Sequence, residues 1–342
     1  MEEKILLDYL KKVSPGTPLR TVINDLLGSG LGALIVFDNP EVQKIIDGGF
    51  RVNCRFTPQR LFELCKMDGA IIVSSDLKRI LYANVLLAPD NTITSNETGT
   101  RHKAGERTAK QANTFVIAVS ERRNKTTIYI GKTRYYLRAS EELLRDVSSN
   151  LQVLEKQREI FDELISNLNI LEMSELVSVS DACKVIQRAE LILKISENIK
   201  RSFTELGKEG NIMYLRYKEL LKDVEKTEDK IIRDYSRWSL KKTKILLSNL
   251  TLDGILDLEA LSRLIVEKPL EETISPEGIR FLSHLTLNEK EISQIVTQFK
   301  TLSGIFEANQ EELEALLKNR ASKIKQEIDN LRTQILEGKV LS

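Results

Sequence analysis

Short apolar runs and segments of helical composition alternate over the first 138 residues. Residues 32–37 are apolar and end at Asp38-Asn39-Pro40, which is typical of a strand followed by a turn. Strands with interspersed helices predict an α/β domain, in which a mixed β-sheet is flanked by helices. Further β-rich runs occupy 70–74, 80–87, 115–119, 126–130 and 134–137.

Capping residues and composition predict the helices of this part. The first 16 residues follow a charged amphipathic helix pattern, and the loop 14–18 is expected to open a second helix that runs to about Leu27. Thr57 is a suitable N-cap with Pro58 at the first helical position, so a helix is expected to about Cys65. Helical composition also predicts a helix over 101–111.

The pattern becomes helical throughout after residue 140, and no proline occurs over 140–232. Apolar residues recur at alternating spacings of three and four, with Arg158 at the one polar slot. We expect either a coiled-coil dimer or a long bundle helix that links two domains, and favour the bundle helix. Gly207 and Gly210 are expected to separate the next helices. The spaced apolar positions are Leu144, Val147, Leu151, Leu154, Phe161, Ile165 and Leu168.

Shorter helices are predicted over 233–342, with breaks at Asp253-Gly254, Lys268-Pro269 and 275–278. These patterns divide the chain into three predicted parts. They are an α/β domain at 1–139, an all-α spine at 140–235 and a small all-α C-terminal domain at 236–342.

Composition limits the classes of function. The chain has 342 residues, enough for two or three domains, and a net charge of +1, so nucleic-acid binding would need a local basic patch. The three cysteines, Cys54, Cys65 and Cys183, have no zinc-ligand spacing, which fits a reducing cytoplasm. No run of 18 apolar residues predicts a membrane span.

Asp68-Gly69 is the first candidate for chemistry. A carboxylate on a glycine turn can bind Mg²⁺ by one or two oxygens while substrate phosphates supply the other ligands. The alternative is a structural turn, which is the commoner role of Asp-Gly between strands.

Residues 99–103, Gly-Thr-Arg-His-Lys, are the second candidate. Thr100 is predicted as the N-cap of the following helix, whose N-terminus would favour an anion. Positive charge on Arg101, His102 and Lys103 is unfavourable at a helix N-terminus, so these side chains favour a bound anion that offsets it. The alternative is a basic first turn that is only solvated. From Arg101 to Arg138 there are ten Arg or Lys and two acidic residues, which favours a nearby polyanion.

Several motifs in fixed order resemble the diadenylate cyclase domain of the DNA integrity scanning (DisA) family. The likeness is strong over residues 5–140 and weaker along the helical spine, where Asp234-Tyr235-Ser236 lies near its end. P-loop, Rossmann, zincin and α/β-hydrolase motifs are absent. The matching segments are Ser14 to Thr17, Gly48-Gly49-Phe50, Lys66 to Ile71, Tyr82-Ala83-Asn84, Glu97 to His102, Glu106-Arg107, Ala109-Lys110-Gln111 and Val116 to Ser120.

The resemblance implies a nucleotidyltransferase that condenses two ATP into the second messenger cyclic di-AMP and two pyrophosphates. Two cyclase domains would face each other, in a homo-octamer of two head-to-head tetramers. Asp68 would hold Mg²⁺ or Mn²⁺ and help to activate the 3′-hydroxyl, with Arg101, His102 and Lys103 also catalytic. The resemblance assigns nucleotide binding to Gly69, Leu87, Thr100, Arg101, His102, Lys103, Ala104, Ser120 and Arg123.

The sequence departs from the family pattern at four positions in or near the motifs and in the C-terminal hairpin. Lys103 stands where arginine is usual, Ala104-Gly105 replaces Thr-Ala, and Glu121 replaces arginine. The family's Gly-x-Gly helix-hairpin-helix turn is replaced by Leu317-Lys318-Asn319, and residues 311–339 balance six basic against six acidic side chains.

These departures leave three functions open. The first is a cyclase whose C-terminal hairpin is degenerate. The second is a catalytically weakened nucleotide-sensing scaffold for branched DNA or a protein. The third and weakest is a purely structural helical assembly protein. The better basic patch for DNA is Arg237-Trp238 with Lys241, Lys242 and Lys244, although a solvated helix with a buried tryptophan explains it equally well.

Overall fold

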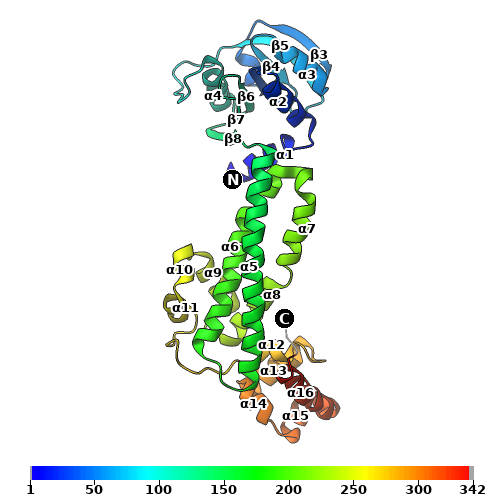
Figure 1. Ribbon diagram of the computed structural model, residues 1–342, viewed down its shortest axis with the longest axis vertical. Coiled ribbons are helices and arrows are strands. Elements are labelled where there is room, and N and C mark those ends of the chain that lie inside the picture. The colour runs from blue at the N-terminus through cyan, green and yellow to red at the C-terminus, as the bar shows by residue number, and fades with distance from the viewer. Residues whose placement is uncertain (1, 339–342) are drawn as a thin grey trace. The chain divides into compact units, whose positions relative to one another are not determined.

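The computed structural model describes residues 2–338. The chain forms two compact units (Figure 1), and each is described by itself. The first comprises Met1–Ser148 and Lys200–Tyr214, and the second Ser149–Ile199 and Leu215–Ser342.

An eight-stranded mixed sheet is the centre of the first unit. Its order is β2-β5-β4-β1-β6-β7-β8, with β3 also paired to β5. Only β1 and β4 pair in parallel among the described strands; the other pairs are antiparallel. The strands are β1 Ala33–Phe37, β2 Ile46–Asp47, β3 Phe50–Arg55, β4 Ala70–Val73, β5 Arg79–Leu87, β6 Phe115–Ser120, β7 Lys125–Ile130 and β8 Thr133–Leu137.

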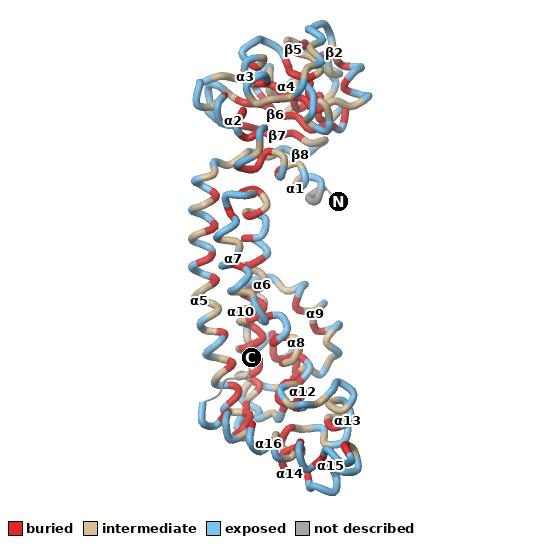
Figure 2. Tube along the Cα trace, turned by 90° about the vertical axis from the view of Figure 1, so that its right-hand side faces the viewer, coloured by how far each residue is buried: buried red, intermediate tan, exposed pale blue. Residues whose placement is uncertain are grey.

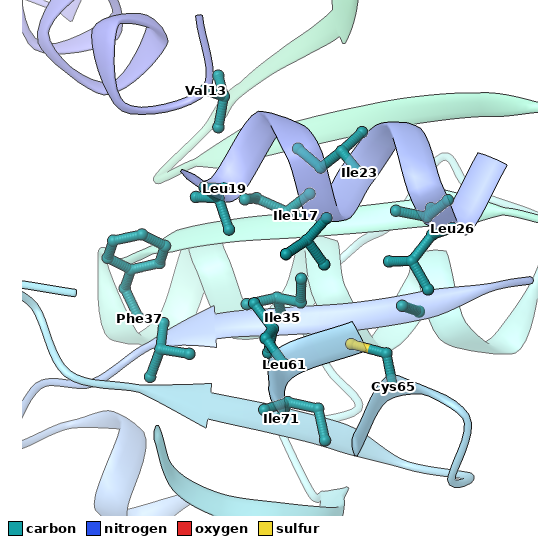
Figure 3. Packing of buried hydrophobic residues seen from close by; sticks show 14 of the residues in the cluster. Val13, Leu19, Ile23, Leu26, Ile35, Phe37, Leu61, Cys65, Ile71 and Ile117 are labelled. Carbon is teal, nitrogen blue, oxygen red and sulfur yellow. The ribbon is translucent and has the colours of Figure 1, made fainter. Parts of the chain in front are cut away.

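Helices cover both faces of this sheet, so its central strands are buried on both sides. Alternate residues of β1 belong to different cores: Ile35 packs with α1 (Glu2–Lys12), α2 (Pro18–Gly28) and α3 (Pro58–Cys65). Figure 3 shows Leu19, Ile23 and Leu26 of α2 against this face. Leu34 and Val36 pack on the opposite face with α4 (Thr100–Ala112). Burial on two sides explains why these strands read as continuous apolar runs.

The predicted strands and helices of this part are confirmed, with two corrections. Thr100 is not the N-cap of α4, because Gly99 is the extended residue before the helix and Thr100 is its first residue. Strands β2 and β3 were not predicted: β3 alternates with exposed Arg51, Asn53 and Arg55, and Asn53 has a positive φ of 43°.

The long predicted helix is α5 (Ser140–Met173), and its apolar seam is buried within one chain, as expected of a bundle helix. The seam begins at Leu143, which is fully buried, and not at Leu144. Arg158 occupies the polar slot because its guanidinium donates to the carbonyls of Leu220 and Lys222. In Figure 2 buried positions recur along α5 and α6 (Val179–Leu206).

Short helices follow α6. Gly207 and Gly210 bound a 3₁₀ turn, η2, that separates α6 from α7 (Asn211–Leu220), as predicted. The predicted break at Asp253-Gly254 is wrong, because both residues lie inside a helix that Thr251 caps. The remaining helices are α8 Val224–Tyr235, α9 Leu240–Ser248, α10 Leu252–Leu256, α11 Leu258–Ile265, α12 Ile279–Leu282, α13 Glu289–Phe299, α14 Leu302–Glu307, α15 Gln310–Leu317, η3 Lys318–Arg320 and α16 Ala321–Leu336.

The predicted fold class is confirmed: an α/β part with a mixed sheet is followed by helices alone. No helix in the described range 2–338 is long and apolar enough to cross a membrane.

Candidate nucleotide site

A cavity of about 800 Å³ lies where the N-terminus of α4 meets the sheet. The polar residues come from three segments, namely the turn before β4, the start of α4 with its preceding loop, and the end of β6 with the turn after it, while β1 and the end of β5 add apolar residues. Most of the predicted site residues are among its lining, and Asp68 and Lys103 are not. The lining residues are Leu34, Gly69, Ala70, Val85, Leu86, Leu87, Glu97, Thr98, Gly99, Thr100, Arg101, His102, Ala104, Ser120, Glu121, Arg122 and Arg123.

The Gly69 turn requires glycine for two reasons. Its φ is +86°, which L side chains rarely adopt. A Cβ there would also lie 2.8 Å from the carbonyl oxygen of Val85, at an irregularity in the β4–β5 pairing. The backbone therefore approaches β5 closely, and Asp68, the residue before the lining residue Gly69, is exposed.

The Arg101 side chain lies against Gly32, the residue before the central strand β1. A Cβ on Gly32 would collide with the Arg101 guanidinium, so that glycine leaves room for the side chain. Consecutive helical residues point in different directions at 3.6 residues per turn, and four in a row cannot all face one cavity. This explains why Arg101, His102 and Ala104 line the cavity whereas Lys103 does not.

Gly105 brings α4 onto the sheet. A Cβ at this position would lie 2.9 Å from Leu34 Cδ1 and 3.3 Å from Val116 Cγ1. The Gly105 departure from the family pattern is therefore accommodated by close packing between α4 and the sheet.

Side chains of α4 form hydrogen bonds with the loop over residues 90–97. Glu106 accepts from Ser95 Oγ at 2.5 Å and from the Asn96 amide at 3.1 Å. Arg107 donates to the carbonyls of Asn91 and Ile93, both at 2.9 Å. Lys110 donates to the Thr94 carbonyl and Gln111 accepts from the Asp90 amide. The Glu106-Arg107 and Lys110-Gln111 motifs thus position the segment that leads into the cavity.

Some of the basic residues between Arg101 and Arg138 line the cavity, and others are bound to groups elsewhere in the first unit. Of the ten basic residues from Arg101 to Arg138, Arg101, Arg122 and Arg123 line the cavity. Arg107, Lys110, Arg134 and Arg138 are held by partners within the first unit, such as Glu205 for Arg138 at 2.8 Å. The count therefore overstated the charge available to a polyanion.

His102 is half-buried among charged groups of both signs. Burial lowers its pKa, and the nearby Arg123 and Arg101 lower it further, whereas the Glu97 carboxylate raises it. The net direction is down, so an unliganded site favours the neutral imidazole. A bound triphosphate would oppose this, because negative charge stabilises the protonated ring.

The turn between β6 and β7 forms the facing wall. The Arg123 amide donates to Ser120 Oγ at 3.3 Å, and Asn124 takes a positive φ of 46°. Glu121, Arg122 and Arg123 all line the cavity from this turn. Glu121, which the sequence showed as a departure from the family's arginine, is therefore a carboxylate on the cavity wall.

The donor set fits one divalent cation held jointly with phosphate. Among residues 2–338 no cluster of three or more His, Cys, Asp or Glu side chains could hold a metal ion. Mg²⁺ commonly takes only one or two carboxylates and completes its octahedron with water and substrate phosphates. Asp68 beside the cavity suits that role, while Glu97 is already engaged by a tyrosine and an arginine.

Sequence reasoning missed part of the lining. Glu97 appeared only as part of a motif, and its burial at a polar site could not be read from the chain. Leu34, Val85 and Leu86 come from β1 and β5, and nothing in the sequence of these strands marks them as cavity residues.

The sequence matches two family models that together span most of the chain. Residues 20–133 match the nucleotide-binding domain of the DisA bacterial checkpoint controller, and residues 137–268 match the linker region of the same controller. Residues 20–133 are thus a nucleotide-binding domain of the diadenylate cyclase class.

Curated relatives agree over almost the full length. The DNA integrity scanning protein DisA of Clostridium kluyveri is 41% identical over 345 residues, covering 98% of each chain. The protein of the same name from Acetivibrio thermocellus is also 41% identical and covers 90% of this chain and 88% of its own. Among solved structures, DacA from Staphylococcus aureus is 21% identical with a TM-score of 0.31, covering 43% of this chain and 96% of its own. The chain belongs to the DisA family.

Proposed function

We propose that this protein is a diadenylate cyclase, which condenses two ATP into cyclic di-AMP and two pyrophosphates. The main support for this proposal is the cavity, which is lined by Arg101 and His102 at the α4 N-terminus, by the Gly69 turn and by the β6–β7 turn. A helix N-terminus with cationic side chains suits phosphates, and the apolar wall of Leu34, Val85 and Leu87 suits a nucleoside. Membership of the DisA family supports the same substrate class.

Two phosphodiester bonds form in the proposed reaction. The 3′-oxygen of each ATP attacks the α-phosphorus of the other, the bond from that phosphorus to the pyrophosphate oxygen breaks, and the hydroxyl proton is released. In this proposal Asp68, next to the lining residue Gly69, orients the attacking hydroxyl, and Arg101, Arg122 and Arg123 stabilise charge on the departing pyrophosphate. Bound Mg²⁺ or Mn²⁺ would supply further charge neutralisation between Asp68 and the phosphates.

Two cavities are needed for each product, so we propose a head-to-head contact of two first units. Leu86 lines the cavity and is 64% exposed, and Met67 beside Asp68 is 38% exposed, which suits burial against a second copy. The head-to-head octamer implied by the family resemblance is part of this proposal.

Purified protein incubated with ATP and Mn²⁺ or Mg²⁺, analysed by chromatography and mass spectrometry, tests the activity. We expect cyclic di-AMP and pyrophosphate from the wild type and none from Asp68→Asn, at unchanged circular dichroism. Absence of product from wild-type protein that is at least dimeric at the assay concentration would refute the proposal.

A second candidate, favoured by Glu121 on the cavity wall, is a nucleotide-sensing scaffold with weakened catalysis. It predicts tight ATP binding without turnover. If its partner is branched DNA, binding to a four-way junction should weaken steeply with salt. Product formation at rates that respond to Asp68→Asn would exclude it.

A further inference from the structure

Glu97 is a buried carboxylate in the wall of the cavity, and its side chain is only 6% exposed. Its Oε1 accepts a hydrogen bond from the Tyr129 hydroxyl at 2.9 Å and one from Arg134 Nη1 at 3.1 Å. The three residues come from the loop before α4, from β7 and from β8. Three segments of the domain therefore converge on one oxygen.

The partners of Glu97 are themselves held in place. Tyr129 is 1% exposed and belongs to the core between the sheet and α4, where its ring lies against Gly105. Burial and the adjacent carboxylate raise the pKa of the Tyr129 phenol, so it remains a donor. The Arg134 guanidinium lies 5.2 Å over the Tyr136 ring and donates inward. A carboxylate excluded from water is stable only with such partners, so this arrangement fixes the Glu97 charge and its position.

His102 is the group on which this charge acts. The charged groups that face it are Glu97 from the loop, Arg123 from the β6–β7 turn and Arg101 from its own helix. Both arginines disfavour a protonated imidazole, whereas Glu97 favours it. A protonated His102 would donate to a phosphate, whereas a neutral one offers one donor at most.

We infer that Glu97 is a positioning residue: held by Tyr129 and Arg134, it fixes the residues that lead into α4 and places a negative charge in the cavity wall that His102 also lines. This inference rests on the proposed function for its substrate. It extends the site from the cavity surface to a buried tyrosine and to an arginine on β8 that does not line the cavity.

Titration of His102 by nuclear magnetic resonance with ¹³C-labelled histidine tests the inference without nucleotide or turnover. The chain has two histidines, so His284 in the second unit serves as an internal reference. In Glu97→Gln we expect the pKa of His102 to fall while that of His284 stays unchanged. An unchanged His102 titration in the folded variant would overturn the inference, whether or not the protein makes cyclic di-AMP.

Nucleotide binding provides a second and independent readout. Calorimetric titration with ATP and Mg²⁺ should show affinity rising as pH falls through the His102 titration, with the rise moved to lower pH in Glu97→Gln. Arg134→Gln should weaken ATP binding by roughly three- to tenfold, and Arg134→Lys should recover part of the loss. Tyr129→Phe, which removes only the hydroxyl and keeps the core packed, should change binding in the same direction.

Lys132→Gln is the matched control, because it removes a positive charge from the exposed β7–β8 turn without touching Glu97. We expect its ATP affinity to equal that of the wild type. Equal losses from Lys132→Gln and Arg134→Gln would show that net charge, and not the Glu97 contact, governs binding, and would overturn the inference. If the wild type failed to bind ATP, the proposed function would fall, and the histidine titration would still decide the role of Glu97.

Discussion

The cavity of the first unit and the C-terminal hairpin of the second are both rich in basic residues, but they use them differently. Arg101, Arg122 and Arg123 line the cavity and form no ion pair with any residue that the structure describes. In the hairpin formed by α15, η3 and α16, Arg320 pairs with Glu291 at 2.6 Å and Lys323 with Glu327 at 3.7 Å.

Further basic side chains near the hairpin are held by carbonyl oxygens. Lys325 donates to the Phe306 carbonyl and Arg332 to the Met173 carbonyl, both at 2.9 Å. Lys339, the sixth basic residue counted from the sequence, lies outside the described residues. Positive charge is thus available to a ligand in the cavity and is largely compensated in the hairpin, a difference that residue counts do not reveal.

The upstream basic patch is compensated as well. Lys244 pairs with Glu225 and Asp229 at 2.9 and 2.6 Å, and Lys242 lies 3.0 Å over the Trp238 ring. Trp238 donates to the Leu264 carbonyl at 3.1 Å. These contacts favour the structural interpretation of this segment over DNA binding.

The comparison predicts the largest loss of ATP turnover for substitution of Arg101, which lines the cavity. Arg101→Ala should lower turnover of ATP by about a hundredfold, because it removes a preorganised cation from the phosphate site. Lys103→Ala should lower it by about threefold or less, since an exposed lysine outside the lining acts only through screened charge. Initial rates of cyclic di-AMP formation measure both.

The two variants are matched in helix position and in charge removed. Equal losses would mean that Lys103 reaches the nucleotide as well, for instance one bound in a facing copy, and the assignment of these two residues would be wrong. Circular dichroism should show the same helix content in both.

Much of the first unit was predictable because local signals agree with the fold. Thr57 and Pro58 start α3 where the capping rules place its first turn, and the apolar runs became buried central strands. The Asp68 turn and the Gly99 segment were identified as candidates, and the structure brings Gly69 together with Thr100, Arg101 and His102 in one cavity.

Other features depend on contacts that no local pattern carries. Thr100 was misassigned as a cap because Gly99, which has no side chain to cap with, can occupy the extended position. Strand β3 is an exposed edge stabilised by pairing to β5, so its own residues gave little signal. The Glu97–Arg134 contact joins residues 37 apart in sequence through the β7–β8 pairing, which composition cannot predict.

A buried acid of the second unit should give that unit a pH-dependent stability. Asp234 accepts from the amides of Ile279 and Arg280 at 2.6 and 3.0 Å and so caps α12. Burial, and then the Glu172 charge, raise the pKa of Asp234 to about 7. Between the ordinary aspartate pKa and 7 the folded state holds a proton that the unfolded state lacks, so this contribution to stability is lost as pH rises.

Asp234→Asn isolates that contribution, because asparagine does not titrate. The variant should be less stable by about 1 kcal/mol at pH 4.5, where one amide loses its acceptor. The difference in unfolding free energy between the variant and the wild type should be smaller at pH 8, because the wild type then holds the buried charge of the Asp234 carboxylate. Urea unfolding at both pH values measures this, and a deficit that stays the same at both would show that Asp234 is ionised throughout.

A smaller effect is expected from the cavity carboxylate. Glu121→Gln should strengthen ATP binding by about threefold at low salt, because it removes a like charge from the wall beside the triphosphate. Glu141→Gln, an exposed glutamate at the start of α5, should leave the affinity unchanged. Weaker binding by Glu121→Gln would instead mean that this carboxylate helps to hold a cation.

The smallest predicted effect is on DNA binding through the hairpin. Lys318, the middle residue of the Leu317-Lys318-Asn319 turn, has φ 51° and ψ −129°, so the turn has a glycine-like backbone with one exposed cation. Because Arg320 is bound to Glu291 and the Thr286 carbonyl, releasing it to a phosphate would break two existing contacts. Lys318→Gln and Arg320→Gln should therefore leave affinity for a four-way junction nearly unchanged, and Arg320→Gln should cost about 0.5–1 kcal/mol of unfolding free energy instead. If each substitution lowered the slope of log affinity against log salt by about one, both side chains would contact phosphates, and the hairpin would resemble the cavity after all.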